Sequence, residues 1–88
     1  MTNRVTVFIP TQLRDYTNGA TQVPASGATV DEALTDLDRR YPGIRFRVVD
    51  EQNRIREHMR IFADGERALR TDATVKSEVH VFGALTGG

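Results

Sequence analysis

Cysteine is absent from the 88-residue chain. Without a thiol the protein can form no disulfide, no cysteine nucleophile and no thiolate metal site. An excess of charge of either sign is also missing, because 12 basic residues balance 12 acidic ones. Non-specific binding to nucleic acid or to an anionic membrane surface needs an excess of Lys and Arg. We therefore expect no nucleic-acid partner and no membrane partner.

Long hydrophobic runs are lacking as well, since no apolar stretch approaches the roughly 20 residues that cross a bilayer. Residues 1–4 lead straight into a strand-like pattern and do not have the character of a signal peptide. With 39% hydrophobic and 27% charged residues, the composition is that of an ordinary folded domain. We expect one small domain that is cytoplasmic and is a monomer when alone.

The first part of the chain predicts a β-hairpin. Val5, Val7 and Ile9 alternate with Thr6 and Phe8, which is typical of a strand with two different faces. Pro10 ends this strand because proline cannot donate a hydrogen bond to a sheet. Asn18-Gly19 suits a tight turn, and residues 21–24 then predict a short second strand.

The spacing of apolar residues predicts one main helix in the middle of the chain. Thr29 and Glu32 fit a capping box, in which the Thr29 hydroxyl accepts a hydrogen bond from the Glu32 backbone N–H. The apolar residues that follow lie on a single stripe at helical spacing: Val30, Ala33, Leu34, Leu37 and Tyr41. Pro42 and Gly43 end the helix.

The second half of the chain predicts a connection followed by further strands. Residues 44–54 form a packed connection with room for one helical turn. Residues 55–63 alternate and predict a strand, and Asp64-Gly65 is a strong signal for a hairpin turn. A short return strand is expected at residues 67–69.

The order of these elements indicates the fold class. A final strand at residues 78–82 and the strand at residues 4–9 are the most apolar, so we expect them to be central neighbours. In the last strand Val79 and Val81 are expected to point inward. One helix can cover only one face of a sheet, which favours an α+β fold. We expect a ubiquitin-like β-grasp, with a mixed sheet of four or five strands and one main helix. Residues 1–82 would form this domain, and residues 83–88 a flexible C-terminal tail.

The tail carries the clearest chemical signal, because the chain ends in Gly87-Gly88. Two glycines have no side chains and can enter a channel too narrow for a Cβ atom. The terminal carboxylate is ionised at neutral pH, and it becomes an acyl donor once activated as an acyl-adenylate. Six extended residues reach at most about 20 Å, enough to place this end in another protein's active site. The six are Gly83, Ala84, Leu85, Thr86, Gly87 and Gly88. The alternative is a frayed terminus without a role.

Three stretches of the chain form recognisable motifs. They are Val7-Phe8-Ile9-Pro10-Thr11-Gln12-Leu13-Arg14, the helix that closes in Asp36-Leu37 and Tyr41-Pro42-Gly43-Ile44, and the strand and tail from Val79 to Gly88. Together they resemble the ubiquitin-like sulfur-carrier family, which includes the small subunit of molybdopterin synthase and the thiamine sulfur carrier. The first two are most similar to the branch that donates sulfur for cysteine biosynthesis. Thr86 departs from the alanine-rich tail of that branch.

The resemblance implies a carrier rather than an enzyme. An ATP-dependent activating enzyme would adenylate the Gly88 carboxylate, and a sulfur source would then convert it to a thiocarboxylate. A sulfur-accepting synthase, of the cysteine synthase type in the cysteine branch, would take the sulfur, and a metalloprotease could release the product. The chain itself would bind no cofactor, since the ATP is used by the activating enzyme.

Three of the four phenylalanines fall on the outer face of the predicted sheet. They are Phe8, Phe62 and Phe82, and Arg60 and His80 share that face. An exposed apolar patch with aromatic and Arg residues is typical of a surface that binds a partner. The alternatives are that residues 44–54 cover the rings, or that the strand faces are one residue out of register. His58 and His80 have no evident third ligand, so we expect no metal site.

Other functions for this fold and tail remain open at this point. A ubiquitin-like modifier would use Gly88 to form isopeptide bonds with lysines of other proteins. A sulfur carrier could also serve molybdopterin, thiamine or a specialised metabolite. A third possibility is an interaction subunit with an inert tail, because a fold does not determine a function.

Overall fold

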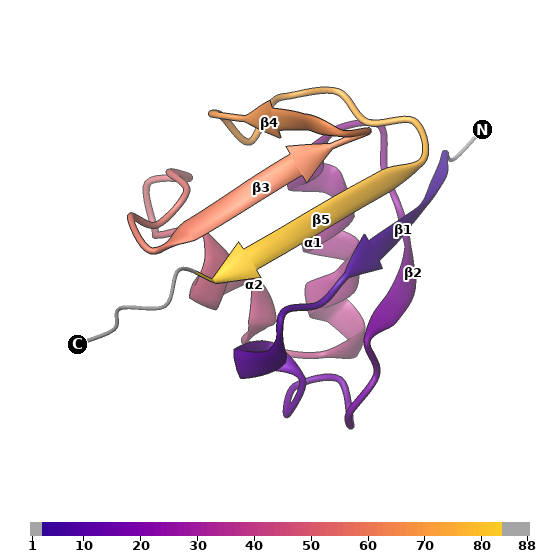
Figure 1. Ribbon diagram of the computed structural model, residues 1–88, viewed down its shortest axis with the longest axis vertical. Helices are drawn as coiled ribbons and strands as arrows, with labels where there is room; N and C mark the ends of the chain where they lie inside the picture. Colours follow the sequence, from indigo (N-terminus) through magenta and orange to yellow (C-terminus); the bar gives the residue numbers. More distant parts are fainter. Residues whose placement is uncertain (1–2, 84–88) are drawn as a thin grey trace.

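The computed structural model describes residues 3–83, so tail residues 84–88 lie outside the described part. Five strands form one mixed sheet in the order β2-β1-β5-β3-β4, and α1 packs against one of its faces (Figure 1). The predicted α+β fold, with one main helix, is confirmed, and the sheet has five strands. Within residues 3–83 no helix has the length and apolar character to cross a membrane.

β1 (Arg4–Phe8) and β2 (Gln22–Ser26) form the predicted antiparallel hairpin. The proline in this strand indicates either an edge strand or a strand end, and β2 lies at the edge of the sheet and continues two residues past Pro24, to Ser26. An edge strand tolerates proline because alternate N–H groups have no partner strand. The connection between the two strands contains a short 3-10 helix, η1 (Thr11–Leu13), which the sequence did not predict.

α1 (Val30–Arg40) begins where the capping box predicts. Thr29 Oγ1 accepts a hydrogen bond from the Glu32 N–H at 3.2 Å, and the Glu32 carboxylate accepts one from the Ala28 N–H at 2.7 Å. Gly43 then turns the chain with a φ of 98°, a left-handed conformation that favours glycine. α2 (Ile44–Val48) follows directly and is the single helical turn expected in this connection.

β3 (Met59–Ala63) begins four residues later than the predicted start at Ile55. Ile55 pairs with Val49 in an isolated bridge instead of joining the sheet. A tight turn permits this pairing, because the Asp50 carboxylate accepts a hydrogen bond from the Arg54 N–H at 3.0 Å. The predicted start was wrong because alternation along the chain does not show which segment a strand will pair with.

β4 (Glu66–Ala68) starts one residue earlier than the predicted strand at residues 67–69. The Asp64-Gly65 turn has only two residues, so pairing with β3 resumes immediately after it. Leu69 therefore lies beyond the strand and is 74% exposed.

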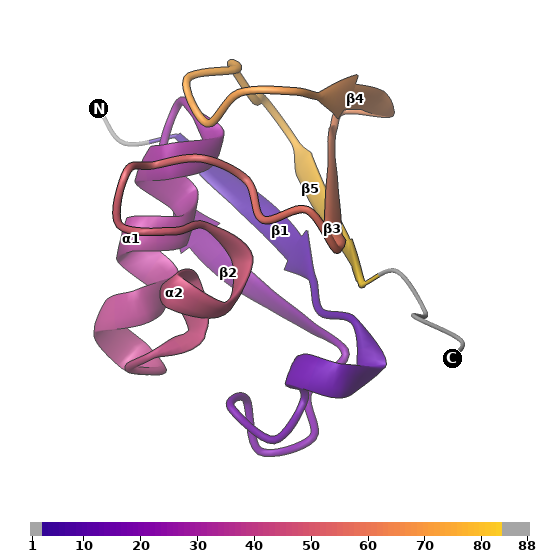
Figure 2. The same cartoon turned by 90° about the vertical axis from the view of Figure 1, so that its left-hand side faces the viewer.

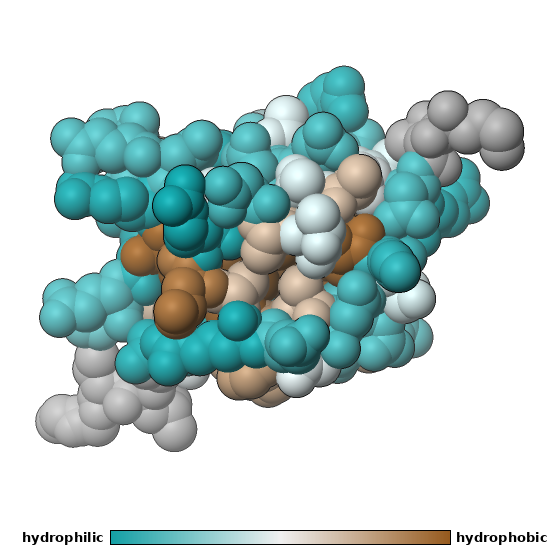
Figure 3. Space-filling view, turned by 90° about the horizontal axis from the view of Figure 1, so that it is seen from above, coloured by the Kyte–Doolittle hydropathy of each residue, from teal (hydrophilic) through white to brown (hydrophobic). Residues whose placement is uncertain are grey.

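Seen from the end that carries β4, hydrophilic residues surround a narrow band of hydrophobic and neutral surface (Figure 3).

β5 (Glu78–Gly83) lies between β1 and β3, as the sequence predicted. It runs parallel to β1 and antiparallel to β3. The strand continues one residue beyond the predicted end at Phe82, because Gly83 pairs with Met59. Gly83 is therefore the last residue of the sheet in the described part, whereas the sequence assigned it to the tail.

The core fills the space between α1 and the inner face of the sheet (Figure 2). The inward-facing residues of the three central strands are almost completely buried: Val5, Val7, Met59, Ile61, Ala63, Val79 and Val81. These are the residues that the alternating pattern placed on the inner face. Both α1 and α2 lie on this side, so they leave the other face of the sheet open (Figure 2).

Candidate partner-docking site

The outer face of the sheet carries the five residues that the sequence selected. Strand register places Phe8, His80 and Phe62 side by side across β1, β5 and β3. Phe82 and Arg60 form the next cross-strand pair, closer to the C-terminal end of β5. Because side chains at alternate positions of a strand share a face, these two rows stand on the same side of the sheet.

The four rings form a continuous array, which we call the aromatic face (Phe8, Phe62, His80 and Phe82). The His80 and Phe8 rings are stacked, with centroids 4.1 Å apart and planes 2° from parallel. The His80 and Phe82 centroids are 6.1 Å apart, and Phe62 meets Phe82 edge-on at 5.6 Å. Stacked and edge-on contacts are the favoured aromatic geometries, so the rings support one another without a helix above them.

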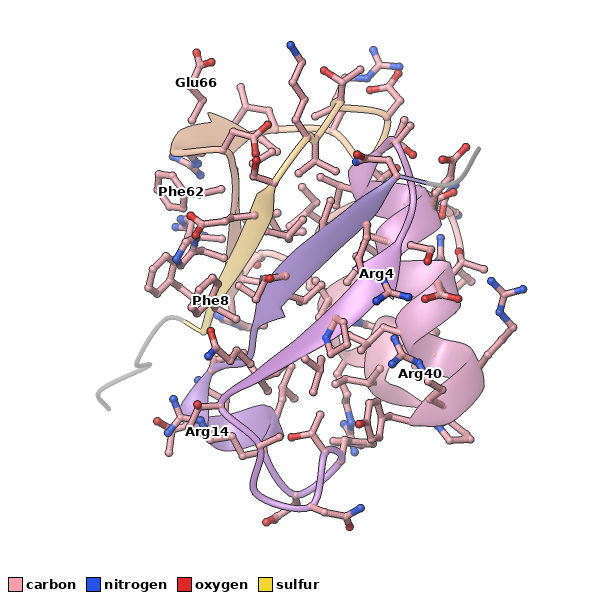
Figure 4. The ribbon with its side chains drawn as sticks, turned by 90° about the vertical axis from the view of Figure 1, so that its right-hand side faces the viewer. Arg4, Phe8, Arg14, Arg40, Phe62 and Glu66 are labelled. Atoms are coloured by element: carbon pink, nitrogen blue, oxygen red, sulfur yellow. The ribbon has the colours of Figure 1, made fainter. Side chains whose placement is uncertain are left out.

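No other described element covers the aromatic face. Phe82 is 51% exposed, while Phe8, Phe62 and His80 are half-buried by one another and by the sheet. Figure 4 shows Phe8 and Phe62 on the side of the sheet that faces away from α1. The alternative in which residues 44–54 cover the rings is wrong, because that segment lies on the helix side (Figure 2). The register assigned from the sequence is confirmed.

Arg60 is held at the border of the aromatic face by backbone carbonyl groups. Its Nη1 donates hydrogen bonds to the carbonyl oxygens of Glu57 at 2.8 Å and of Met59 at 3.1 Å. Both acceptors are neutral, so neither of them offsets the charge of the guanidinium. Aromatic rings beside a fixed Arg are common in the central contacts of protein interfaces.

Two surface hollows flank Gly83, at the point where the chain leaves the sheet. One lies between β5 and the segment that follows β1, and it includes Arg14 and Phe82 in its lining. The other is lined by Tyr16, Arg47 and His58, among others. Gln12 and Gly83 line both hollows.

Gln12 lies directly against the backbone of Gly83. A Cβ atom built on Gly83 would overlap the Gln12 side-chain amide. Gln12, Arg14 and Arg47 were not selected as site residues from the sequence, although residues 7–14 carried the family motif. The positions of the first two depend on η1, which brings Gln12 and Arg14 beside the far end of a strand about seventy residues away in sequence.

Phe46 is the fourth phenylalanine and lies on α2, away from the aromatic face. It is 53% exposed, and the Arg56 guanidinium carbon lies 4.5 Å from its ring centroid. Arg56 also donates a hydrogen bond from Nε to the Phe46 carbonyl at 2.7 Å. The pair closes the loop between α2 and β3, which gives this ring a structural role.

The carboxyl groups with shifted pKa values have structural roles: Asp36 joins α1 to β2, and Asp50 and Asp64 stabilise turns. The pKa is lowered for Asp36, Asp50 and Asp64, and the largest cause in each case is a hydrogen bond from a backbone N–H. Asp64 accepts three such bonds, from Lys76, Ser77 and Glu78, at 2.8 to 3.1 Å. Residues 3–83 contain no group of three or more His, Cys, Asp or Glu residues that could hold a metal ion.

The sheet order and the single packed helix define the class as a ubiquitin-like β-grasp domain, and solved structures confirm it. The chain aligns with a chain of the Amycolatopsis orientalis BexX/CysO complex at 35% identity and a TM-score of 0.87, covering 96% of this chain and 99% of that one. Mycobacterium tuberculosis CysO aligns at 31% identity and a TM-score of 0.81, covering 92% of this chain and 99% of that one. The fold is shared by small archaeal modifier protein 1 from Methanosarcina acetivorans, which aligns at 22% identity and a TM-score of 0.79. That alignment covers 100% of this chain and 99% of the archaeal protein.

Sequence comparison places the chain more narrowly. It is 33% identical over 91 aligned positions to the sulfur carrier protein CysO of Mycobacterium tuberculosis, which covers 96% of this chain and 98% of that protein. CysO of Mycobacterium bovis matches equally well. No family profile matches the chain. The chain belongs to the family of ubiquitin-like sulfur carrier proteins, and the resemblance drawn from its motifs is confirmed.

Proposed function

We propose that this protein carries sulfur as a thiocarboxylate on Gly88. The observation that supports this most directly is full-length similarity to CysO together with the Gly87-Gly88 end. In the first step the Gly88 carboxylate oxygen attacks the α-phosphate of ATP, which forms an acyl-adenylate and releases pyrophosphate. In the second step a sulfide-equivalent nucleophile attacks the acyl carbon, AMP leaves, and the thiocarboxylate remains.

The carrier contributes recognition to this reaction, and the activating enzyme contributes the chemistry. The aromatic face would dock on the activating enzyme while residues 83–88 extend into its active site. Gly83 ends β5 at the border of this face, so a docked domain delivers the tail from a fixed point. The ATP is bound and consumed by the activating enzyme, and the carrier holds no cofactor of its own. Since the reaction consumes ATP, we place it in the cytoplasm.

We propose cysteine biosynthesis as the pathway. CysO is a sulfur carrier in the relatives, and the motifs of residues 7–14 and 36–44 are most similar to the cysteine branch. A synthase of the cysteine synthase type would accept the sulfur, and a metalloprotease would release the product if it stays attached to Gly88. In Amycolatopsis orientalis a CysO is found in complex with BexX, so a second type of partner is an alternative.

The decisive experiment is the intact mass of the protein after incubation with ATP, a sulfide donor and the activating enzyme of the same organism. We expect a mass gain equal to the replacement of one oxygen by sulfur, located in the C-terminal peptide. A variant that lacks Gly88 is the matched control and should gain no mass. If the enzyme modifies its other substrates and leaves this chain unchanged, the proposal is wrong.

A protein modifier is the second candidate, because the archaeal modifier proteins share this fold. It predicts covalent adducts with other proteins, which appear as higher-mass bands on a denaturing gel in the presence of ATP. Adducts that require Gly88, with no thiocarboxylate detected, would favour the modifier over the carrier.

A further inference from the structure

Three arginines lie near the end of β5 at Gly83, and we call them the arginine rim (Arg14, Arg47 and Arg60). Arg14 and Arg47 line the two hollows that meet at Gly83. Arg60 lies opposite Phe82, one position from the pair that Gly83 makes with Met59. The rim therefore lies near the end of β5, and Figure 4 shows Arg14 on the same side of the molecule as Phe8, farther along toward η1.

Among residues 3–83, the hydrogen bonds of the rim arginines are all made to neutral groups. Arg14 donates from Nε to the Ile9 carbonyl at 3.0 Å. Arg47 donates from Nε to the Tyr16 hydroxyl at 2.5 Å, and its guanidinium carbon lies 5.8 Å from the Tyr16 ring centroid. Arg60 donates to two backbone carbonyls. Within residues 3–83 no carboxylate forms an ion pair with these three guanidinium groups, although Asp15 lines the same hollow as Arg47.

Most of the other eight arginines are paired with carboxylates, while Arg4, Arg56 and Arg67 have no ion pair within residues 3–83. Five form ion pairs with carboxylates: Arg39, Arg40, Arg45, Arg54 and Arg70. Between residues 3 and 83 no salt bridge involves a member of the arginine rim. Asp15 and Glu57 are close in sequence to Arg14 and Arg60, and neither forms an ion pair with them. Because the formal net charge of the chain is zero, the positive charge at the rim is a local feature.

Unpaired but anchored guanidinium groups are suited to binding carboxylates. Arg presents several N–H donors in a rigid fork, and a bidentate carboxylate contact is stronger than a contact between neutral groups. Anchoring by Tyr16 and by backbone carbonyls reduces the side-chain entropy that binding must remove. Charges at the border of an interface mainly raise the association rate and define orientation, and their effect falls with ionic strength.

We propose that the arginine rim binds an acidic surface of the activating enzyme around the opening that receives the tail. This inference rests on the proposed function, and it adds the chemistry of the partner surface to it. The aromatic face and the rim meet at Phe82 and Arg60, so the two would form one continuous interface. Docking of the rim would orient Gly83 toward the opening before the tail enters.

The test compares two triple variants with the same change in net charge. The rim variant is Arg14→Gln, Arg47→Gln and Arg60→Gln. The control variant is Arg4→Gln, Arg39→Gln and Arg70→Gln, three exposed arginines outside the rim. The readout is ATP-dependent pyrophosphate release by the activating enzyme, with KM for the carrier and kcat measured separately at about 50 mM and 300 mM NaCl.

We expect the rim variant to raise KM about tenfold at low salt with little change in kcat, since three exposed ion pairs would be lost. The KM of the natural chain should rise with salt, and that of the rim variant should be nearly independent of salt. The control variant should match the natural chain at both salt concentrations. Equal KM values for the rim and control variants overturn the inference.

A third variant tests whether the effect on KM comes from the charge of the rim, and the natural chain tests the proposed function. The substitutions Arg14→Lys, Arg47→Lys and Arg60→Lys keep the charge and lose the forked geometry, so KM should lie between that of the natural chain and that of the rim variant and should still rise with salt. If these lysines raise KM as much as the glutamines do, charge is not the cause and the inference is wrong. A natural chain that is not adenylated at all overturns the proposed function itself.

Discussion

The His80 imidazole lies parallel to the Phe8 ring, with 4.1 Å between the ring centroids. Phe8 ends β1 and His80 is in the middle of β5, so the contact joins the first and last strands of the fold. The two strands run parallel, which requires the connection between them to cross the sheet. The aromatic face therefore exists only after the last strand has inserted between β1 and β3.

The exposed ring of Phe82 should matter more for binding than for stability. Phe82→Ala removes a side chain that is 51% exposed, so we expect a loss of less than about 1 kcal/mol in the free energy of unfolding. We expect affinity for the activating enzyme to fall about tenfold or more, as for an aromatic residue central to an interface. Urea denaturation and titration calorimetry measure the two quantities.

Leu69→Ala is the matched control for this substitution. Leu69 is 74% exposed and lies at the other end of the sheet, beyond β4. It should leave affinity unchanged. If Phe82→Ala mainly unfolds the protein, the ring supports the fold and the docking role is contradicted.

Ile61 should be among the most sensitive positions of the core. It is fully buried at the centre of β3 and packs under α1 with the other inward-facing residues. Ile61→Ala should cost about 2–5 kcal/mol of stability, and Ile61→Val about 0.5–1.5 kcal/mol. A graded series in urea denaturation supports close packing, whereas equal small effects would show that the site can collapse around the cavity.

The Asp64 carboxylate should make stability depend on pH. Hydrogen bonds from the backbone N–H groups of Glu78, Lys76 and Ser77 lower the pKa of Asp64. A pKa that is lower in the folded state gives stability that is fully present above the unfolded pKa of about 4. This stability is lost as the pH falls through the folded value.

Asp64→Asn tests this dependence, because asparagine tolerates the positive φ of 52° at this position and removes the charge. The variant should be less stable than the natural chain at pH 7, and the difference should shrink below about pH 4. Asp72→Asn is the control, since Asp72 is exposed and pairs only with Arg70 at 3.2 Å. A difference that is constant with pH would mean that the charge of Asp64 is not responsible.

Gly87→Ala addresses the tail, which lies outside the described residues. The substitution should leave the melting temperature unchanged. It should slow adenylation, because a Cβ atom must then pass through a channel shaped for glycine. Single-turnover measurement of AMP formation separates this step from docking. Normal turnover of the variant would contradict a narrow channel in the activating enzyme.

The sequence by itself determined the local elements and their faces. Alternation placed Val5, Val7 and Val79 inward, the Thr29 cap started the main helix, and Asp64-Gly65 made the hairpin turn. It also placed the rings of the aromatic face on one side, since this needs only the period of a strand. Each of these features depends on neighbours within a few residues.

The tertiary structure alone decided which strand segments pair and what surrounds Gly83. Ile55 pairs with Val49 instead of joining the sheet. β5 extends to Gly83 because Met59 lies opposite, and η1 places Arg14 in the hollow at the end of β5. The neutral anchors of the arginine rim depend on the same long-range contacts. The packing of the whole domain determines which segments distant in sequence pair, so the local pattern of residues does not predict those pairs.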